Sequence, residues 1–147
     1  MGVRISDRDL GMKKIFREIR KIDNKSVKAG VLKNAGKEPN GTSLVDVAVY
    51  NEFGTSHIPS RPFIRIASDK NKSFWTDESE KIIDDIVDGG TANFNSLGKT
   101  MVNDIKDVMG DTTLLESNAP STIRRKGRNE PLIDKGKLKS SIDFEVD

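Results

Sequence analysis

Apolar residues near the start of the chain recur at spacings of three and four and predict an amphipathic helix. This stripe consists of Met12, Ile15, Phe16, Ile19 and Ile22. Lysines and arginines fill the opposite side, as on the solvated face of such a helix, so we do not interpret that side as a DNA site. Ser6 and Asp9 stand at the spacing of a capping box before the stripe. We therefore predict a helix that follows Asp9 and is broken at residues 23–24.

Alternating apolar and polar positions predict two strands, one after this helix and one at the end of the chain. The apolar positions are Val27, Ala29 and Val31 in the first strand and Ile142, Phe144 and Val146 in the second. We place the second strand at residues 141–146. Together they predict a small antiparallel sheet.

The middle of the chain has the pattern of long helices. Residues 63–87 contain no Gly or Pro, and their apolar residues supply the faces of one long helix or of two in sequence. Gly89 and Gly90 end this segment. A further helix is predicted from about residue 93 to residue 109, before Gly110. Its apolar stripe consists of Leu97, Met101, Ile105 and Val108.

Residues 44–53 fit two patterns. Valines at positions 45, 47 and 49 alternate as in a strand, whereas a helix would place Leu44, Ala48 and Asn51 on one face. The local pattern alone slightly favours a strand. Two further segments, residues 34–43 and 119–130, are rich in Gly, Pro and polar residues and are predicted to be irregular. We expect both to be flexible in the free subunit and to become ordered when neighbouring subunits arrive.

Composition limits the chain to one modest core. Its 147 residues fit a single domain, and hydrophobic and charged residues make up 34% and 33% of them. We predict an α+β fold in which a small antiparallel sheet packs with the N-terminal amphipathic helix and two or three further helices. There is no cysteine, no apolar run of the ~20 residues that span a bilayer, and no signal peptide in the polar N-terminus. We therefore expect assembly in the cytoplasm, with no membrane partner.

Charge is unevenly distributed, although the formal net charge is only +2. Residues 1–37 carry eleven Lys or Arg and four Asp or Glu, whereas residues 77–88 carry six acids and only Lys81. The simplest interpretation is that these are solvated faces of separate helices. Alternatively, the unlike faces meet between neighbouring subunits of a ring. A third hypothesis places the acidic face along a DNA channel, where it would keep DNA from sticking.

Residue types that support catalysis are scarce. His57 is the only histidine and lies in a Gly/Pro-rich loop, with no nucleophile pattern around any serine. Asp84, Asp85 and Asp88 lack partner ligands at a metal-binding spacing, and Gly89 and Gly90 are not followed by the Lys-Ser/Thr of a phosphate loop. We predict no enzyme, no catalytic residue, no cofactor and no metal site.

The strongest basic cluster is in the segment 119–130 and consists of Arg124, Arg125, Lys126 and Arg128. Such a loop can bind phosphates. It lacks interleaved aromatic residues, so a solvated segment or an arm on a neighbouring subunit is the simpler interpretation.

Two segments resemble phage tail-completion and virion-morphogenesis proteins of the HK97-like tail module. Residues 51–55 read Asn-Glu-Phe-Gly-Thr, and residues 58–64 read Ile-Pro-Ser-Arg-Pro-Phe-Ile, where the family has Pro-Ala-Arg-Pro-Phe after an acid, an aromatic, Gly and Thr. Residues 131–138 read Pro-Leu-Ile-Asp-Lys-Gly-Lys-Leu and resemble the family's Pro-Leu-Ile-Asp-Thr-Gly-x-Leu. Ser60 and Lys135 depart from the family pattern, in place of Ala and Thr. The resemblance also favours a helix at residues 44–53.

The resemblance implies a structural virion protein at the neck or the head-proximal end of the tail. It implies a homo-oligomeric ring, a hexamer, that contacts other neck and tail proteins and passes DNA through its lumen without sequence-specific binding. The runner-up interpretations are a tail terminator, a head-closure subunit, or a DNA-binding accessory protein that uses residues 124–128. The residues we predict at the subunit interface are Glu52, Phe53, Gly54, Arg61, Pro62, Phe63, Arg124, Arg125, Lys126, Asp134, Gly136 and Leu138.

Overall fold

A computed structural model describes residues 8–147 and contains the predicted N-terminal helix, α1 (Met12–Ile22). The proposed capping-box residue Ser6 lies outside the described residues. Within them, a carboxylate oxygen of Asp9 accepts hydrogen bonds from the backbone N–H groups of Gly11 (3.0 Å) and Lys13 (3.3 Å). Asp9 therefore satisfies donors that the first turn of a helix leaves free.

Both predicted strands are present and pair with each other. β1 (Val27–Val31) and β2 (Ile142–Val146) are antiparallel, with Val27 opposite Val146 and Val31 opposite Ile142. This pairing joins the strand that follows α1 to the C-terminal strand in one small sheet. The fold is therefore α+β, as predicted.

The described residues form six helices, more than the three or four predicted. After α1 these are α2 (Leu44–Phe53), α3 (Phe63–Val87), α4 (Asn95–Val108), α5 (Pro120–Lys126) and α6 (Lys137–Ser140). Residues 63–87 form one unbroken helix, which decides between the two predicted alternatives. Among residues 8–147, no helix combines the length and apolar character needed to cross a bilayer.

The structure overturns the slight local preference for a strand at residues 44–53. Ser43 caps α2, because its hydroxyl accepts a hydrogen bond from the N–H of Val45 at 3.1 Å. Leu44 and Ala48 are buried on the inner face of the helix. The helix that the family resemblance favoured is the one that buries these side chains.

The prediction that residues 119–130 are irregular is wrong for residues 120–126, which form α5. Pro120 stands in the first turn, where its missing N–H costs nothing, and Gly127 ends the helix in a left-handed conformation (φ 73°). In the local sequence pattern both residues indicate only a break in regular structure. Residues 34–43 are irregular as predicted, and a bridge between Lys37 and Ser43 closes their loop.

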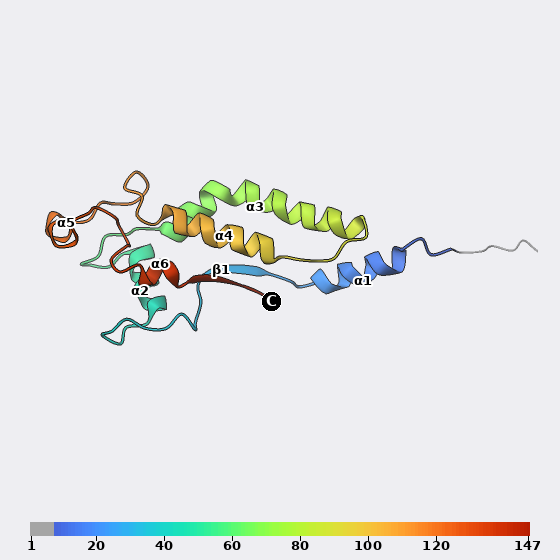
Figure 1. Cartoon of the computed structure of the whole chain (residues 1–147), viewed down its shortest axis with the longest axis horizontal. Coiled ribbons are helices and arrows are strands. Elements are labelled where there is room, and N and C mark those ends of the chain that lie inside the picture. The colour runs from blue at the N-terminus through green and yellow to red at the C-terminus, as the bar shows by residue number, and fades with distance from the viewer. Residues whose placement is uncertain (1–7) are drawn as a thin grey trace, which may run out of the picture.

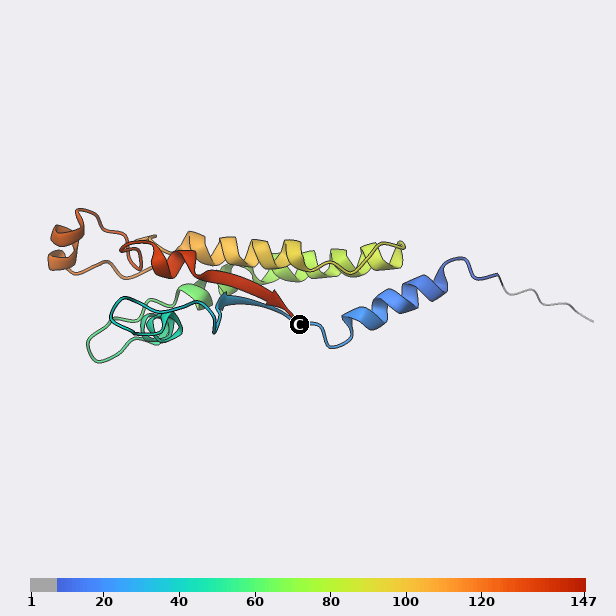
Figure 2. The same ribbon diagram turned by 60° about the horizontal axis from the view of Figure 1, so that its bottom comes forward.

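Helix α4 is the centre of the fold. It packs against α3 on one side and against both strands on the other (Figure 1). The buried core gathers where α2, the start of α3, the second half of α4 and α6 come together. These segments lie in the same half of the molecule (Figure 2). The members of the core are Leu44, Ala48, Phe63, Ala67, Val102, Ile105, Val108, Met109, Leu115, Leu138 and Ile142. The helix that packs on the sheet is thus α4, whereas we expected the N-terminal helix there. Helix α1 instead contacts the C-terminal end of α3.

Candidate functional site

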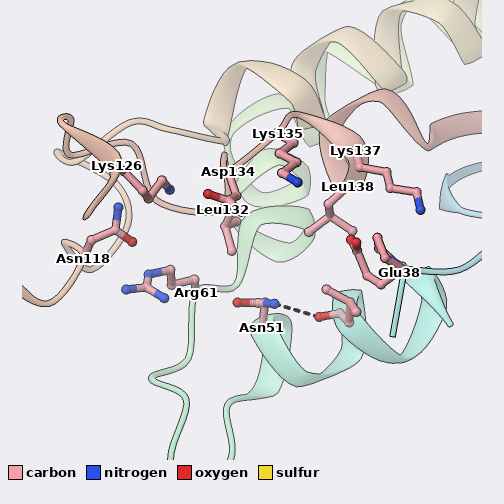
Figure 3. A pocket seen from close by; sticks show the side chains of 12 residues that line it. Glu38, Asn51, Arg61, Asn118, Lys126, Leu132, Asp134, Lys135, Lys137 and Leu138 are labelled. Atoms are coloured by element: carbon pink, nitrogen blue, oxygen red, sulfur yellow. Dashed lines mark hydrogen bonds between the residues drawn. The ribbon is translucent and has the colours of Figure 1, made fainter. Parts of the chain in front are cut away.

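A pocket lined by both polar and apolar side chains lies where the two family-like segments meet. Its volume is about 450 Å³, and its walls come from α2, α6, the end of α5 and the intervening loops (Figure 3). Four predicted interface residues line it, namely Arg61, Lys126, Asp134 and Leu138. Other lining residues were not predicted from the sequence: Glu38, Pro39, Val47, Asn51, Asn118, Leu132, Lys135 and Lys137. The fold thus joins segments that are about 70 residues apart in the sequence.

Arg61 ties this corner together from inside the chain. Its guanidinium donates from Nε to the carbonyl oxygen of Glu116 (2.7 Å) and from Nη2 to that of Ser117 (2.9 Å), and its backbone N–H donates to the carbonyl of Asn51 (2.6 Å). The residue is only 8% exposed. Within the chain, the Arg61 side chain therefore holds residues 116–117 against the corner between α2 and α3. Its availability for a bond across a subunit seam stays a prediction.

Glu52 fixes the angle between α2 and α3. Its two carboxylate oxygens accept hydrogen bonds from the N–H groups of Ile64 and Arg65, each at 3.0 Å. Pro62 precedes α3 and offers no side-chain cap, so the helix takes its cap from the preceding helix. A carboxylate here also faces the positive end of the helix dipole. Glu52 is buried, and its carboxylate has a structural role within the chain.

The turn between these helices explains the glycine and threonine of the first segment. Gly54 has φ 76°, and a Cβ at this position would lie 2.9 Å from the backbone nitrogen of Ser60. The Thr55 hydroxyl accepts hydrogen bonds from the backbone N–H groups of His57 (3.2 Å) and Ile58 (3.0 Å). The Ser60 hydroxyl donates to the carbonyl of Glu52 at 2.9 Å, a bond that the family's alanine does not make. This part of the pattern therefore encodes a rigid turn.

The pocket presents several hydrogen-bond donors, one of them unused. Nδ2 of Asn118 is buried and has no hydrogen-bond partner within residues 8–147. Lys126 donates from Nζ to the carbonyl of Glu130 (3.1 Å), and burial lowers the pKa of its ammonium group. Lys137 donates to the carbonyl of Lys37 on the opposite wall. Such donors suit carbonyl or carboxylate oxygens.

The remaining predicted interface residues are divided between the core and the surface. Phe63 and Leu138 are buried, whereas Phe53 is 71% exposed at the end of α2. Gly136 has φ 77° and precedes α6. Pro62 stands at the start of α3, and Arg124 and Arg125 are on α5. Phe53 is the member of this set that offers apolar surface to a neighbour.

Part of the basic cluster is engaged by the chain itself. Arg128 donates to the carbonyl of Asp134 (2.8 Å) and forms an ion pair with Glu130 (2.5 Å). Because Lys126 is also bonded, fewer of the four cations are free to contact phosphates than the sequence suggested. This weakens the nucleic-acid interpretation.

His57 lies in the exposed turn after Gly54, and within residues 8–147 no group of three or more His, Cys, Asp or Glu residues is placed to hold a metal ion. No family model, curated protein or solved structure matches the chain.

Proposed function

We propose that the chain is a structural protein of a tailed bacteriophage or prophage, a tail-completion or head–tail joining subunit that forms a ring at the neck or head-proximal tail end. The observation that carries this proposal is the meeting of the two family-like segments at one corner. Arg61, from the first segment, and Leu132, Asp134 and Leu138, from the second, line the same pocket. The two family-like segments therefore contribute to the same corner of the fold.

Surface composition supports an assembled state. Large apolar side chains are exposed on α1, α2 and α3, and α1 and α2 lie toward opposite ends of the elongated molecule (Figure 1). On α2 they are Val49, Tyr50 and Phe53, which are three or four residues apart or adjacent and so lie close together. Uncovered apolar surface of this kind marks protein contacts. A ring built head to tail would cover surfaces at both ends of each subunit.

In this proposal the ring is a hexamer, DNA passes through its lumen without sequence-specific contacts, and other neck and tail proteins bind its faces. The tail-terminator and head-closure roles belong to the same class of protein. They differ from tail completion in the neighbour that the ring binds.

The test is the mass of the purified chain in solution over a wide range of concentration, with negative-stain images with and without its candidate tail partners. Rings, alone or with a partner, support the proposal and give the symmetry. Phe53→Ser should weaken the association, whereas Lys99→Ser, at an exposed position on α4, should not. A monomer that ignores tail proteins and binds DNA with a steep salt dependence would identify a DNA-binding accessory protein instead.

A further inference from the structure

Helix α1 leaves its apolar stripe uncovered. Met12 and Phe16 are each 55% exposed and Ile19 is 40% exposed, although the spacing of these residues is that of a buried face. Leu10, just before the helix, is 86% exposed. Only Ile15 and Ile22 of the predicted stripe are partly buried. Much of this apolar stripe therefore has no packing partner among the described residues.

The same helix is strongly basic. Residues 8–22 contain six Lys or Arg and two Asp or Glu. Lys21 pairs with Glu18 at 2.6 Å, and Lys13 is 4.0 Å from Asp9, but Arg17 and Arg20 form no ion pair with any described residue. A partner for α1 should thus combine apolar side chains with carboxylates.

The C-terminal half of α3 has this combination. Ile83 is 40% exposed and Val87 53% exposed, one turn apart on the helix. Glu80 and Asp84 each precede one of them by three residues and are exposed. Of the six acids in residues 77–88, only Glu78 forms an ion pair inside the described chain, with Lys81 at 2.5 Å.

The α3 surface is not covered by the α1 of its own chain. That helix is tied to the turn after α3, because Lys14 donates to the carbonyl of Gly89 and Glu18 accepts the N–H of Ala92 at 3.4 Å. From there α1 runs away from the sheet and past the end of α3 (Figures 1 and 2). While these contacts hold, a second copy must supply the α1 that covers this face.

We propose that α1 of one copy docks along residues 77–87 of α3, and the adjoining Asp88, in a second copy. The apolar stripe would lie against Ile83 and Val87, and Arg17 and Arg20 would lie near Glu80 and Asp84. The lengths agree, since α1 and residues 77–87 of α3 each contain eleven helical residues, which span about 16 Å. An anionic membrane or a nucleic acid would attract the basic α1 but would be repelled by the acidic half of α3. A second copy of the chain offers an oppositely charged surface to each of these two faces. The contact requires only a second copy and is independent of the virion role.

Charge reversal tests this contact. Arg17→Glu with Arg20→Glu should weaken self-association about tenfold, and so should Glu80→Lys with Asp84→Lys, because each places like charges across the contact. The four substitutions together should restore association to within about threefold of the starting chain. Sedimentation equilibrium gives the association constants, and circular dichroism verifies that each variant is folded. Lys33→Glu with Lys99→Glu makes the same change in net charge as the arginine reversal, at exposed positions outside both faces, and should have little effect.

Three results would overturn the inference: a chain that remains monomeric at every concentration, reversals with no more effect than the control, or a fourfold variant that remains as weak as either half. The virion role is tested separately, by measuring binding to tail proteins. If the fourfold variant regains self-association but the chain binds no tail protein, the contact between copies is supported and the virion role is contradicted. If rings form with tail proteins and the charge reversals do not affect them, the virion role is supported and this contact is contradicted.

Discussion

The ring of Phe144 lies directly over Gly98. A Cβ at position 98 would be 2.1 Å from Cδ2 of that ring, well inside van der Waals contact. Gly98 lies in α4 and Phe144 in β2, so the missing side chain lets the second strand pack closely against the central helix. The closing strand of the sheet therefore depends on a glycine more than 40 residues earlier.

We expect Gly98→Ala to destabilise the fold by roughly 1–3 kcal/mol through overpacking, despite a gain of about 1 kcal/mol in helix propensity. Urea unfolding measures the change. In a Phe144→Ala background the clash is absent, so Gly98→Ala should be neutral or stabilising there. Equal effects in both backgrounds would show that the ring does not restrict position 98.

Removal of the Glu52 carboxylate should loosen the start of α3. Glu52→Ala leaves the N–H groups of Ile64 and Arg65 without their acceptor, and we expect a loss of about 1–2 kcal/mol, as for other helix caps. Thermal unfolding of the variant gives the value. Asp69→Ala, which removes a carboxylate at an exposed position of α3, is the matched control and should change little.

Arg61→Lys should detach residues 116–117 from the corner. Lysine keeps the positive charge but cannot make both guanidinium bonds, so we expect a loss of roughly 1–3 kcal/mol. Limited proteolysis should then cut faster within residues 116–130 than in the unchanged chain. Cleavage there at an unchanged rate would mean that other contacts hold this segment.

Stability should fall in acid through carboxyl groups whose pKa is lowered in the folded chain, among them Glu18 and Asp111. The pKa of Glu18 is lowered chiefly by its hydrogen bond from Lys21, and that of Asp111 by the Thr113 hydroxyl. A lowered folded-state pKa stabilises above the unfolded value, about 4 for these groups, and this contribution is lost as the pH falls through the folded value. Glu18→Gln and Thr113→Ala should each reduce the acid-dependent loss of melting temperature. Thr112→Ala should not, and the same slope in all three variants would assign acid sensitivity to other groups.

Local pattern in the sequence was enough to predict α1, α3, α4 and both strands. In each, the side chains repeat with the period of the element for long enough, or with a clean enough alternation, to leave one interpretation. The order of charged residues along the chain likewise identifies the basic N-terminal region and the acidic half of α3, because both are contiguous in the sequence.

Tertiary structure decided the rest. Residues 44–53 carry both periods, and burial of Leu44 and Ala48 selects the helix. Arg61 is equally consistent with an exposed or a buried position until the carbonyls of Glu116 and Ser117 are brought to it. A periodic stripe indicates that a helix has an apolar face, but only the arrangement of the elements shows whether that face is covered. In α1 much of it is exposed, which could not be read from local spacing because the covering surface depends on contacts between distant segments or between copies.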